Sequence, residues 1–216
     1  MALACQPKGC EVDDEVGVGP WPGGPQMWPP VGPGSPYDAD LLAEGDRRNV
    51  VDRYRYWSVE AVVADLDTHR SPVHVAFENT VHDLNVGSVV RTANAYNAAG
   101  IHVVGRRRWN RRGAMVTDRY LHLHHHGDVA DLLGWADAAG LPVLGVDNVD
   151  GSVPIESYRL PRQCVLLFGT ESTGLSPQAV AGCRDVLHIT QHGSTRSLNL
   201  GAAAAIAMYA WAVQHL

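Results

Sequence analysis

Apolar positions along most of the chain follow two rhythms, short continuous runs and longer stretches with helical spacing. Four apolar runs have the length of buried strands: residues 73–77, 101–104, 141–146 and 165–168. Stretches with helical spacing lie between them at residues 85–97 and 128–139, the second beginning at Asp128 as an N-cap. Because strands alternate with helices, the pattern predicts an α/β fold with a mostly parallel sheet and helices on both faces.

The last quarter of the chain continues this alternation and contains two polar loops. Ser176 and Pro177 open a short predicted helix, and residues 186–189 form a further predicted strand. Ser197 is expected to cap an Ala-rich helix that runs nearly to residue 216. Open α/β sheets bind ligands beyond the carboxyl ends of their strands, so the loops that follow the last two predicted strands form the first candidate site.

Residues 1–46 lack this periodicity. They hold eight of the thirteen prolines, and eight acidic residues against one lysine give them a charge of −7. The remaining residues carry +1, because the whole chain carries −6, and all sixteen of their cationic side chains are arginines. Such an N-terminal composition buries too little apolar surface to offset the entropy lost on ordering. We therefore expect a disordered tail at 1–46 and one folded domain at 47–216.

Two arginine-rich segments are candidates for contact with RNA. Residues 47–70 are expected to be largely helical, and Arg53 and Arg55 alternate there with aromatic residues. Residues 105–113 form a glycine-bounded loop around Trp109 with five arginines: Arg106, Arg107, Arg108, Arg111 and Arg112. Phosphates would relieve the repulsion among these charges, and arginine also suits bidentate phosphate contact and base stacking. The alternatives are a helix whose aromatic side chains pack inward and an ordinary solvated loop.

Cysteine and histidine usage adds little to this picture. The four cysteines form no Cys-x-x-Cys pair, which favours a reduced, cytoplasmic protein, and we expect no signal peptide and no membrane span. His122, His124 and His126 would share one face of a strand, where a metal site is conceivable. No cysteine or carboxylate pair at ligand spacing accompanies them, so we expect no metal.

Three segments resemble the signature motifs of the SpoU (TrmH) branch of the SPOUT RNA methyltransferases. They are residues 85–94 (NVGSVVRTAN), 168–176 (FGTESTGLS) and 189–200 (ITQHGSTRSLNL). The resemblance covers residues 73–213. Three departures from the family pattern are Thr190–Gln191 in place of Pro–Met, Gly201 in place of Ser, and Asn97 in place of a glycine.

The resemblance implies a deep C-terminal trefoil knot that binds S-adenosylmethionine, and a homodimer in which an arginine of one subunit lies near the cofactor of the other. Carried over by motif, the expected cofactor-binding residues are Phe168, Gly169, Thr170, Glu171, Gly174, Ile189, Gln191, Leu198 and Asn199. Adenine requires backbone hydrogen bonds in an apolar slot, which loops at strand ends can provide.

The resemblance further implies methyl transfer to a ribose 2′-hydroxyl of RNA. The expected catalytic residues are Arg91, Asn85, Glu171, Ser197 and Asn199. Arg91 is the family's proposed base, but arginine has a pKa of roughly 12.5–13.8, so a phosphate clamp or a stabiliser of a developing alkoxide is the alternative. Glu171 could pair with Arg91 or fix the cofactor loop, and the two asparagines could orient Arg91 or the substrate.

Two other functions compete with this one. A catalytically silent RNA-binding protein would keep the same fold, and failure to bind S-adenosylmethionine would favour it. A dinucleotide-dependent oxidoreductase is disfavoured because no G-x-G-x-x-G follows the first strand. The short basic, aromatic segment before the catalytic part resembles tRNA-acting members of the family more than rRNA-acting ones, so tRNA is slightly favoured over rRNA as the expected substrate.

Overall fold

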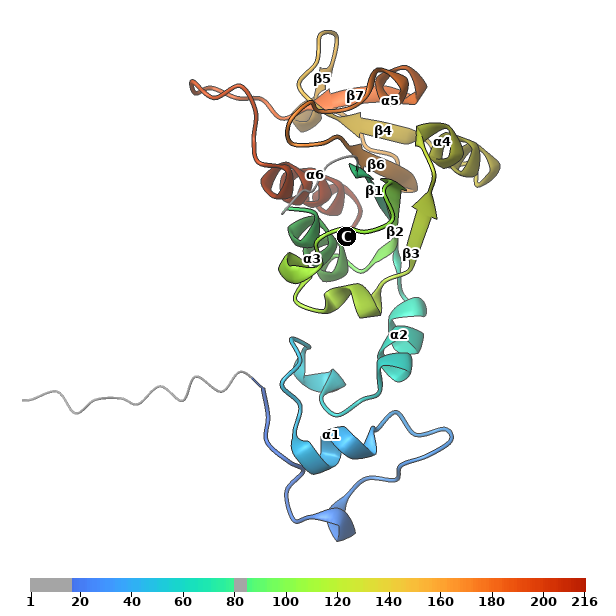
Figure 1. The fold of residues 1–216 in the computed structure, drawn as a ribbon, viewed down its shortest axis with the longest axis vertical. Coiled ribbons are helices and arrows are strands. Elements are labelled where there is room, and N and C mark those ends of the chain that lie inside the picture. Colours follow the sequence, from blue (N-terminus) through green and yellow to red (C-terminus); the bar gives the residue numbers. More distant parts are fainter. Residues whose placement is uncertain (1–16, 80–84) are drawn as a thin grey trace, which may run out of the picture. The chain divides into compact units, whose positions relative to one another are not determined.

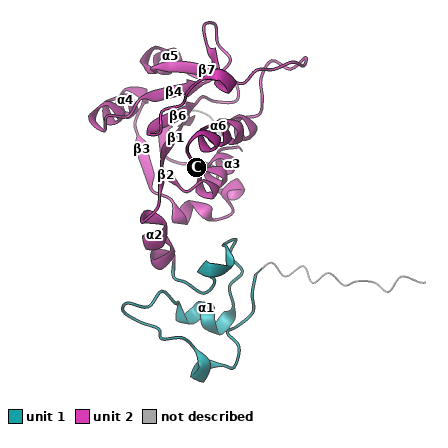
Figure 2. Ribbon diagram, turned by 180° about the vertical axis from the view of Figure 1, so that it is seen from behind, with its two compact units in different colours: residues 1–58 teal, residues 59–216 magenta. Residues whose placement is uncertain are grey.

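The structure of the protein, a computed structural model, describes residues 17–79 and 85–216 (Figure 1). The chain divides into two compact units, residues 1–58 and residues 59–216 (Figure 2). The second unit contains the sheet and is described first.

One parallel sheet of seven strands is the framework of the described part of the second unit. Its strands are β1 (Ser71–Asn79), β2 (Ala98–Gly105), β3 (Leu123–His126), β4 (Val143–Val146), β5 (Val153–Pro154), β6 (Cys164–Phe168) and β7 (Asp185–His188). They lie in the order β3-β2-β1-β6-β4-β7-β5, and every paired neighbour is parallel. The predicted mostly parallel sheet is therefore confirmed.

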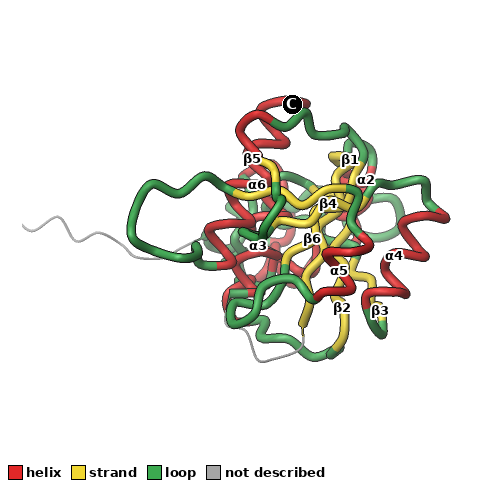
Figure 3. The backbone as a smooth tube through the Cα atoms, turned by 90° about the horizontal axis from the view of Figure 1, so that it is seen from above, coloured by secondary structure: helices red, strands yellow, loops and turns green. Residues whose placement is uncertain are grey.

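Helices cover both faces of this sheet. The helices of the second unit are α2 (Val59–Asp67), α3 (Val86–Ala95), α4 (Val129–Ala138), α5 (Pro177–Gly182) and α6 (Leu200–His215). Side chains of α3 and α6 pack in one core cluster, and side chains of α4 and α5 pack in another. Figures 1 and 3 show these two pairs on opposite faces of the sheet.

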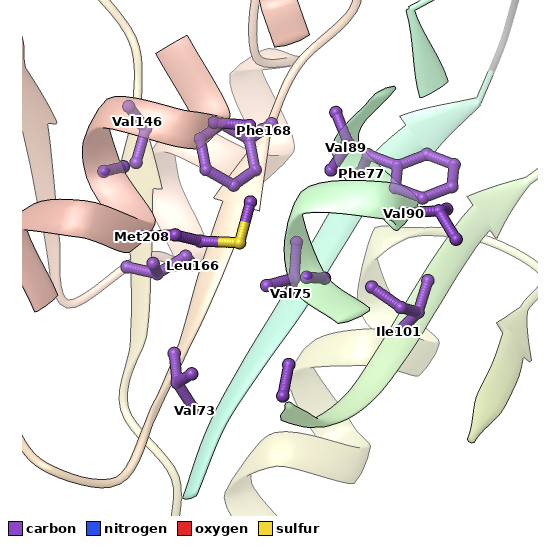
Figure 4. Close-up of a cluster of buried hydrophobic side chains, with 14 of the residues drawn as sticks. Val73, Val75, Phe77, Val89, Val90, Ile101, Val146, Leu166, Phe168 and Met208 are labelled. Atoms are coloured by element: carbon purple, nitrogen blue, oxygen red, sulfur yellow. The ribbon is translucent and has the colours of Figure 1, made fainter. Parts of the chain in front are cut away.

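The core follows the alternation of a strand buried on both sides. In β1, Val75 and Phe77 point to the α3–α6 face, whereas Ala76 points to the α4–α5 face. In β6, Leu166 and Leu167 divide in the same way, and both are fully buried. Figure 4 shows Val75, Phe77 and Leu166 in the larger cluster, together with Met208 of α6.

Most predicted elements are confirmed, and the differences are as follows. Residues 47–70 are not largely helical, because α2 covers only Val59–Asp67 and Asp52–Tyr54 is a 3₁₀ turn. α6 begins at Leu200, and its cap is Asn199, whose Oδ1 accepts a hydrogen bond from the N–H of Ala202 at 3.3 Å, so the expected Ser197 cap is wrong. β5 was not predicted, since a two-residue strand leaves no periodic pattern.

The prediction of a disordered tail is wrong for residues 17–46, which form part of the first unit. This unit contains α1 (Ala39–Glu44) and two 3₁₀ turns, Pro25–Met27 and Asp52–Tyr54. Leu42 is fully buried, and Trp21 packs edge-on against aromatic rings at 5.9 and 5.2 Å. Distant aromatic contacts thus supply the apolar burial that the local composition does not reveal.

A buried ion pair fixes the end of the first unit. The carboxylate of Asp46 is fully buried and accepts two hydrogen bonds from the guanidinium of Arg48, at 2.8 and 2.6 Å. Burial raises the pKa of Asp46, but the hydrogen bonds from Arg48 and from the N–H of Tyr56 outweigh that effect and lower it below its usual value. Because this network ties residues 46–57 together, the boundary between units falls after Ser58 and not after residue 46.

Candidate functional site

A cavity of about 480 Å³ lies beyond the carboxyl ends of three neighbouring strands, β6, β4 and β7. Its walls come from residues 146–149 after β4, from residues 168–174 after β6, and from the segment between β7 and α6. This is where an open parallel sheet is expected to bind a ligand, and the volume is that of a small-molecule site.

Most of the predicted cofactor-binding residues line this cavity. They are Phe168, Gly169, Thr170, Glu171, Gly174, Ile189, Gln191 and Leu198, and the predicted catalytic residue Ser197 lies on the same wall. Residues 146–149 and Arg196 also line the cavity, although the sequence motifs do not include them. The signal for residues 146–149 was available, because they follow a buried parallel strand whose carboxyl end lies at the same edge of the sheet.

The turn after β6 is built on glycines. A Cβ atom at Gly169 would lie 2.0 Å from the carbonyl carbon of Gly174, so no larger residue fits there. Gly174 has a φ of +69°, and its N–H and carbonyl exchange hydrogen bonds with Thr170 at 2.9 and 3.0 Å. Asp147 accepts the N–H of Leu175 at 2.7 Å and holds the turn against the end of β4.

One carboxylate oxygen joins the three predicted motifs. Oε1 of Glu171 accepts hydrogen bonds from Nδ2 of Asn85 at 2.6 Å, from Nδ2 of Asn199 at 2.8 Å and from the N–H of Leu200 at 3.3 Å. Asn199 also caps α6 with its other side-chain atom. We call this group, Asn85, Glu171 and Asn199, the Glu171 junction; it fixes the cavity-lining turn to the first turns of α3 and α6.

Arg91 lies on α3, less than two turns after Asn85. Its side chain is exposed, and it is not among the residues of the cavity wall. The hydrogen bonds to Glu171 come from the two asparagines and a backbone amide. Of the two roles considered for Glu171, these bonds favour fixing the loop over pairing with Arg91.

The arginine loop, residues 105–113, has a fixed backbone and solvated charges. Nδ2 of Asn79 donates to the carbonyl oxygens of Arg106 and Arg108, at 2.5 and 3.0 Å. Trp109 is only 8% exposed and packs in the core, so it does not stack on bases. The five predicted arginines are all exposed, and one of them, Arg111, forms an ion pair with Asp118 at 3.4 Å.

The other two predicted RNA-binding arginines lie in the first unit. The guanidinium of Arg53 lies over the ring of Tyr54, 4.4 Å from its centroid. Arg55 donates to the carbonyl oxygen of Arg48 at 2.7 Å and to that of Asp46 at 3.3 Å. Because these structural bonds occupy the guanidinium of Arg55, its expected role in RNA binding is not supported.

A row of histidines lies on the face of the sheet that α4 covers, against Trp135. His74 Nδ1 and His102 Nε2 lie 3.0 Å apart, and His102 Nδ1 and His126 Nε2 lie 2.9 Å apart. Burial and the neighbouring imidazoles lower the pKa of His102 to about 2 and that of His74 to about 4. No group of three His, Cys, Asp or Glu side chains in the described ranges has metal-binding geometry.

No described helix has the length and apolar character to cross a bilayer.

Comparison with known proteins places these motifs in one family. Residues 72–209 match the model of the SpoU rRNA Methylase family. The tRNA (guanosine(18)-2′-O)-methyltransferase of Escherichia coli strain K12 is 25% identical over 153 residues, which cover 69% of this chain and 67% of that protein. The 23S rRNA (uridine(2479)-2′-O)-methyltransferase of Streptomyces viridochromogenes is 28% identical over 184 residues, or 79% of this chain and 63% of that protein.

Solved structures give the same answer. An AdoMet-bound rRNA methyltransferase from Sinorhizobium meliloti matches this fold with a TM-score of 0.61 and 27% identity, over 70% of this chain and 60% of that chain. The chain thus spans about two thirds or less of the length of these relatives. The matched residues 72–209 contain the whole Glu171 junction and the cavity wall.

Proposed function

The chain belongs to the SpoU rRNA methylase family, and from this membership we propose that it transfers a methyl group from S-adenosylmethionine to a ribose 2′-hydroxyl of RNA. The observation that carries the proposal is the Glu171 junction, in which one carboxylate ties all three family motifs together at the edge of a cavity of cofactor size.

The cavity residues fit the proposed cofactor. Phe168, Ile189 and Leu198 offer apolar walls for an adenine ring, and the glycines at 169 and 174 leave the backbone close to the space. Gln191 lines the cavity, and its Oε1 is buried and has no hydrogen-bond partner among the described residues. A buried acceptor without a partner is costly, and an amino group of the ligand would satisfy it.

S-adenosylmethionine, when bound, would supply an activated methyl group for in-line displacement: the bond from methyl to the 2′-oxygen forms as the bond from methyl to sulfur breaks, S-adenosylhomocysteine leaves, and the hydroxyl proton passes to water. The chain's contribution is positioning: the Glu171 junction keeps the cavity turn in place before the reaction, so little order has to be gained on binding. Arg91 stays outside the wall of its own cavity and exposed to solvent. We assign it to the bound RNA, where it clamps a phosphate and stabilises negative charge on the attacking 2′-oxygen.

We also propose that two copies form the functional unit. The exposed face of α6 carries an apolar stripe whose exposed fractions are 40% for Ile206, 61% for Tyr209, 67% for Val213 and 76% for Leu216. A second copy packed on this stripe would bury it. Arg91 is not part of the cavity wall of its own subunit. The proposed dimer would bring Arg91 of one subunit to the cavity of the other.

The proposed C-terminal knot is supported by strand order alone. β7 lies between β4 and β5, and β6 lies between β1 and β4, so later strands enter between earlier ones. In such a knot, one segment of the chain threads through a loop formed by another. The cavity loops that follow β6 and β7 are the segments that would take part in this threading.

The arginine loop is the proposed surface for RNA phosphates, and tRNA is the proposed substrate class, as for the E. coli relative. The test incubates purified protein with tritiated S-adenosylmethionine and either unmodified tRNA transcripts or rRNA fragments. We expect label in alkali-stable 2′-O-methyl nucleotides of tRNA. Cofactor and RNA binding without transfer would support the silent RNA-binding alternative, and transfer to rRNA alone would reassign the substrate.

A further inference from the structure

Two neighbouring residues after the arginine loop have an unusual backbone. Met115 has a φ of +48° and Val116 a φ of +66°, both in the left-handed region. This conformation is uncommon for any residue other than glycine and exceptional for a β-branched one such as valine. Strained residues of this kind persist only where the surroundings hold them, and they gather at functional sites.

The strained pair presents apolar side chains to solvent. Met115 is 54% exposed and Val116 is 50% exposed, although the residues on either side, Ala114 and Thr117, are almost fully buried. Oγ1 of Thr117 donates to the carbonyl oxygen of Ala114 at 2.7 Å, which closes the turn beneath the pair. We call Met115 and Val116 the apolar tip.

The apolar tip is attached rigidly to the helix that carries Arg91. A Cβ atom at Gly87 of α3 would lie 2.6 Å from the backbone N of Ala114 and from Cα of Gly113. The backbone of Gly87, two residues after Asn85 of the Glu171 junction, thus contacts the backbone of Gly113 and Ala114, just before the tip. The tip is therefore held in a fixed position relative to α3, the helix that carries Arg91.

The positive charge of the residues around the apolar tip favours a nucleic acid as its partner. Residues 105–120 contain six arginines (106, 107, 108, 111, 112 and 119) and one aspartate, a sum of +5. Every one of these arginines is exposed. An apolar protein surface would not be drawn to such a rim, whereas a nucleic acid offers phosphates to the arginines and apolar base faces to the tip.

We propose that the apolar tip is an RNA wedge, which inserts against an unstacked base of the RNA whose phosphates the surrounding arginines bind. The inference rests on the proposed function, because it assigns a further contact on the same RNA-binding surface. Insertion of a wedge costs the free energy of unstacking one base step, and it exposes the neighbouring nucleotide to the protein. RNA recognition generally depends on such splayed-out bases.

The test measures binding of a fluorescein-labelled unmodified tRNA transcript by anisotropy over a series of salt concentrations. The double variant Met115→Ala/Val116→Ala should weaken binding about tenfold, the scale of one lost base contact, with an unchanged salt slope because no phosphate contact is lost. Met115→Leu/Val116→Ile keeps the apolar bulk and should bind like the wild type. Met27→Ala/Val31→Ala makes the same change at two exposed positions of the first unit and should have no effect.

The outcomes separate this inference from the function it rests on. Failure of the wild-type protein to bind the tRNA would overturn RNA binding by this surface, and with it the wedge. Wild-type binding with an unaltered Met115→Ala/Val116→Ala variant would overturn the wedge alone. A variant that binds RNA normally but changes its oligomeric mass in light scattering would show that the tip contacts a second copy of the chain, which also overturns it.

Discussion

Nδ2 of Asn85 donates a hydrogen bond of 2.6 Å to Oε1 of Glu171, across 86 residues of sequence. The same oxygen accepts from Asn199 at 2.8 Å. These bonds connect the helix that carries Arg91 with the turn that lines the cavity. A single carboxylate thereby fixes the cavity turn of each subunit to the helix that carries the Arg91 of the same subunit.

Replacing Glu171 by Ala should therefore reduce methyl transfer about 100-fold, the cost of a small misplacement of reacting groups. The measurement is the initial rate of tritium transfer to tRNA by protein of verified secondary structure. Asp137→Ala removes an exposed carboxylate of α4 that is not part of the cavity wall, and this variant should keep the wild-type rate. Equal rates for Glu171→Ala and the wild type would show that the junction does not position the site.

Replacing Gly169 by Ala should abolish cofactor binding, because the new methyl group would lie 2.0 Å from the backbone of Gly174. Calorimetric titration with S-adenosylmethionine measures the loss. The matched control is Gly134→Ala in α4, where a Cβ meets nothing within 4 Å. Alanine in a helix interior should raise the free energy of unfolding there by about 0.5–1 kcal/mol. Normal affinity of the Gly169→Ala protein would remove the turn from the binding site.

Replacing Arg91 by Ala should lower methyl transfer about 10²–10³-fold while leaving the affinity for S-adenosylmethionine unchanged, since its side chain lies outside the cavity wall. Arg91→Lys keeps the charge and should recover part of the rate. Arg162→Ala, another exposed arginine, serves as the control. If the Arg91→Ala protein lost cofactor affinity to the same extent as activity, Arg91 would belong to the donor site and not to the RNA.

Stability should fall as the pH drops below about 6.5, the ordinary pKa of histidine. Burial and neighbouring imidazoles lower the pKa of His102 to about 2, so between these values the unfolded chain binds a proton that the folded chain does not. The free energy of unfolding then decreases by about 1.4 kcal/mol per pH unit for this one group.

Denaturant unfolding at pH 7, 6 and 5 measures this slope. The His102→Gln variant should show a shallower dependence, whereas His192→Gln, which removes an exposed histidine, should leave it unchanged. If the free energy of unfolding depended on pH in the same way in the wild type and in His102→Gln, the folded state would not lower the pKa of His102.

The sequence predicts those elements whose signals are local. The apolar run of β6, bounded by Gly169, and the Ser176–Pro177 start of α5 are recognisable because their signals lie within a few residues. The start of α6 was misplaced because Ser197 and Asn199 are both good caps, and the choice between them depends on the distant Glu171.

Contacts between distant residues explain the remaining differences. The burial of Leu42 and the ion pair of Asp46 are invisible in a composition dominated by proline, glycine and acidic residues. The Glu171 junction could be predicted only in its members, since the motifs name Asn85 and Asn199 but not the oxygen on which they converge.

Mass spectrometry of RNA nucleosides is the decisive test of methyl transfer to a ribose 2′-hydroxyl by this protein. Total RNA from cells that lack the protein is incubated with purified wild-type protein and S-adenosylmethionine, and the products are mapped. We predict a gain of one 2′-O-methylated nucleotide, and the gain should depend on both Glu171 and Arg91. A methyl group on a base, or no gain in any RNA although the protein is folded and binds the cofactor, would contradict it.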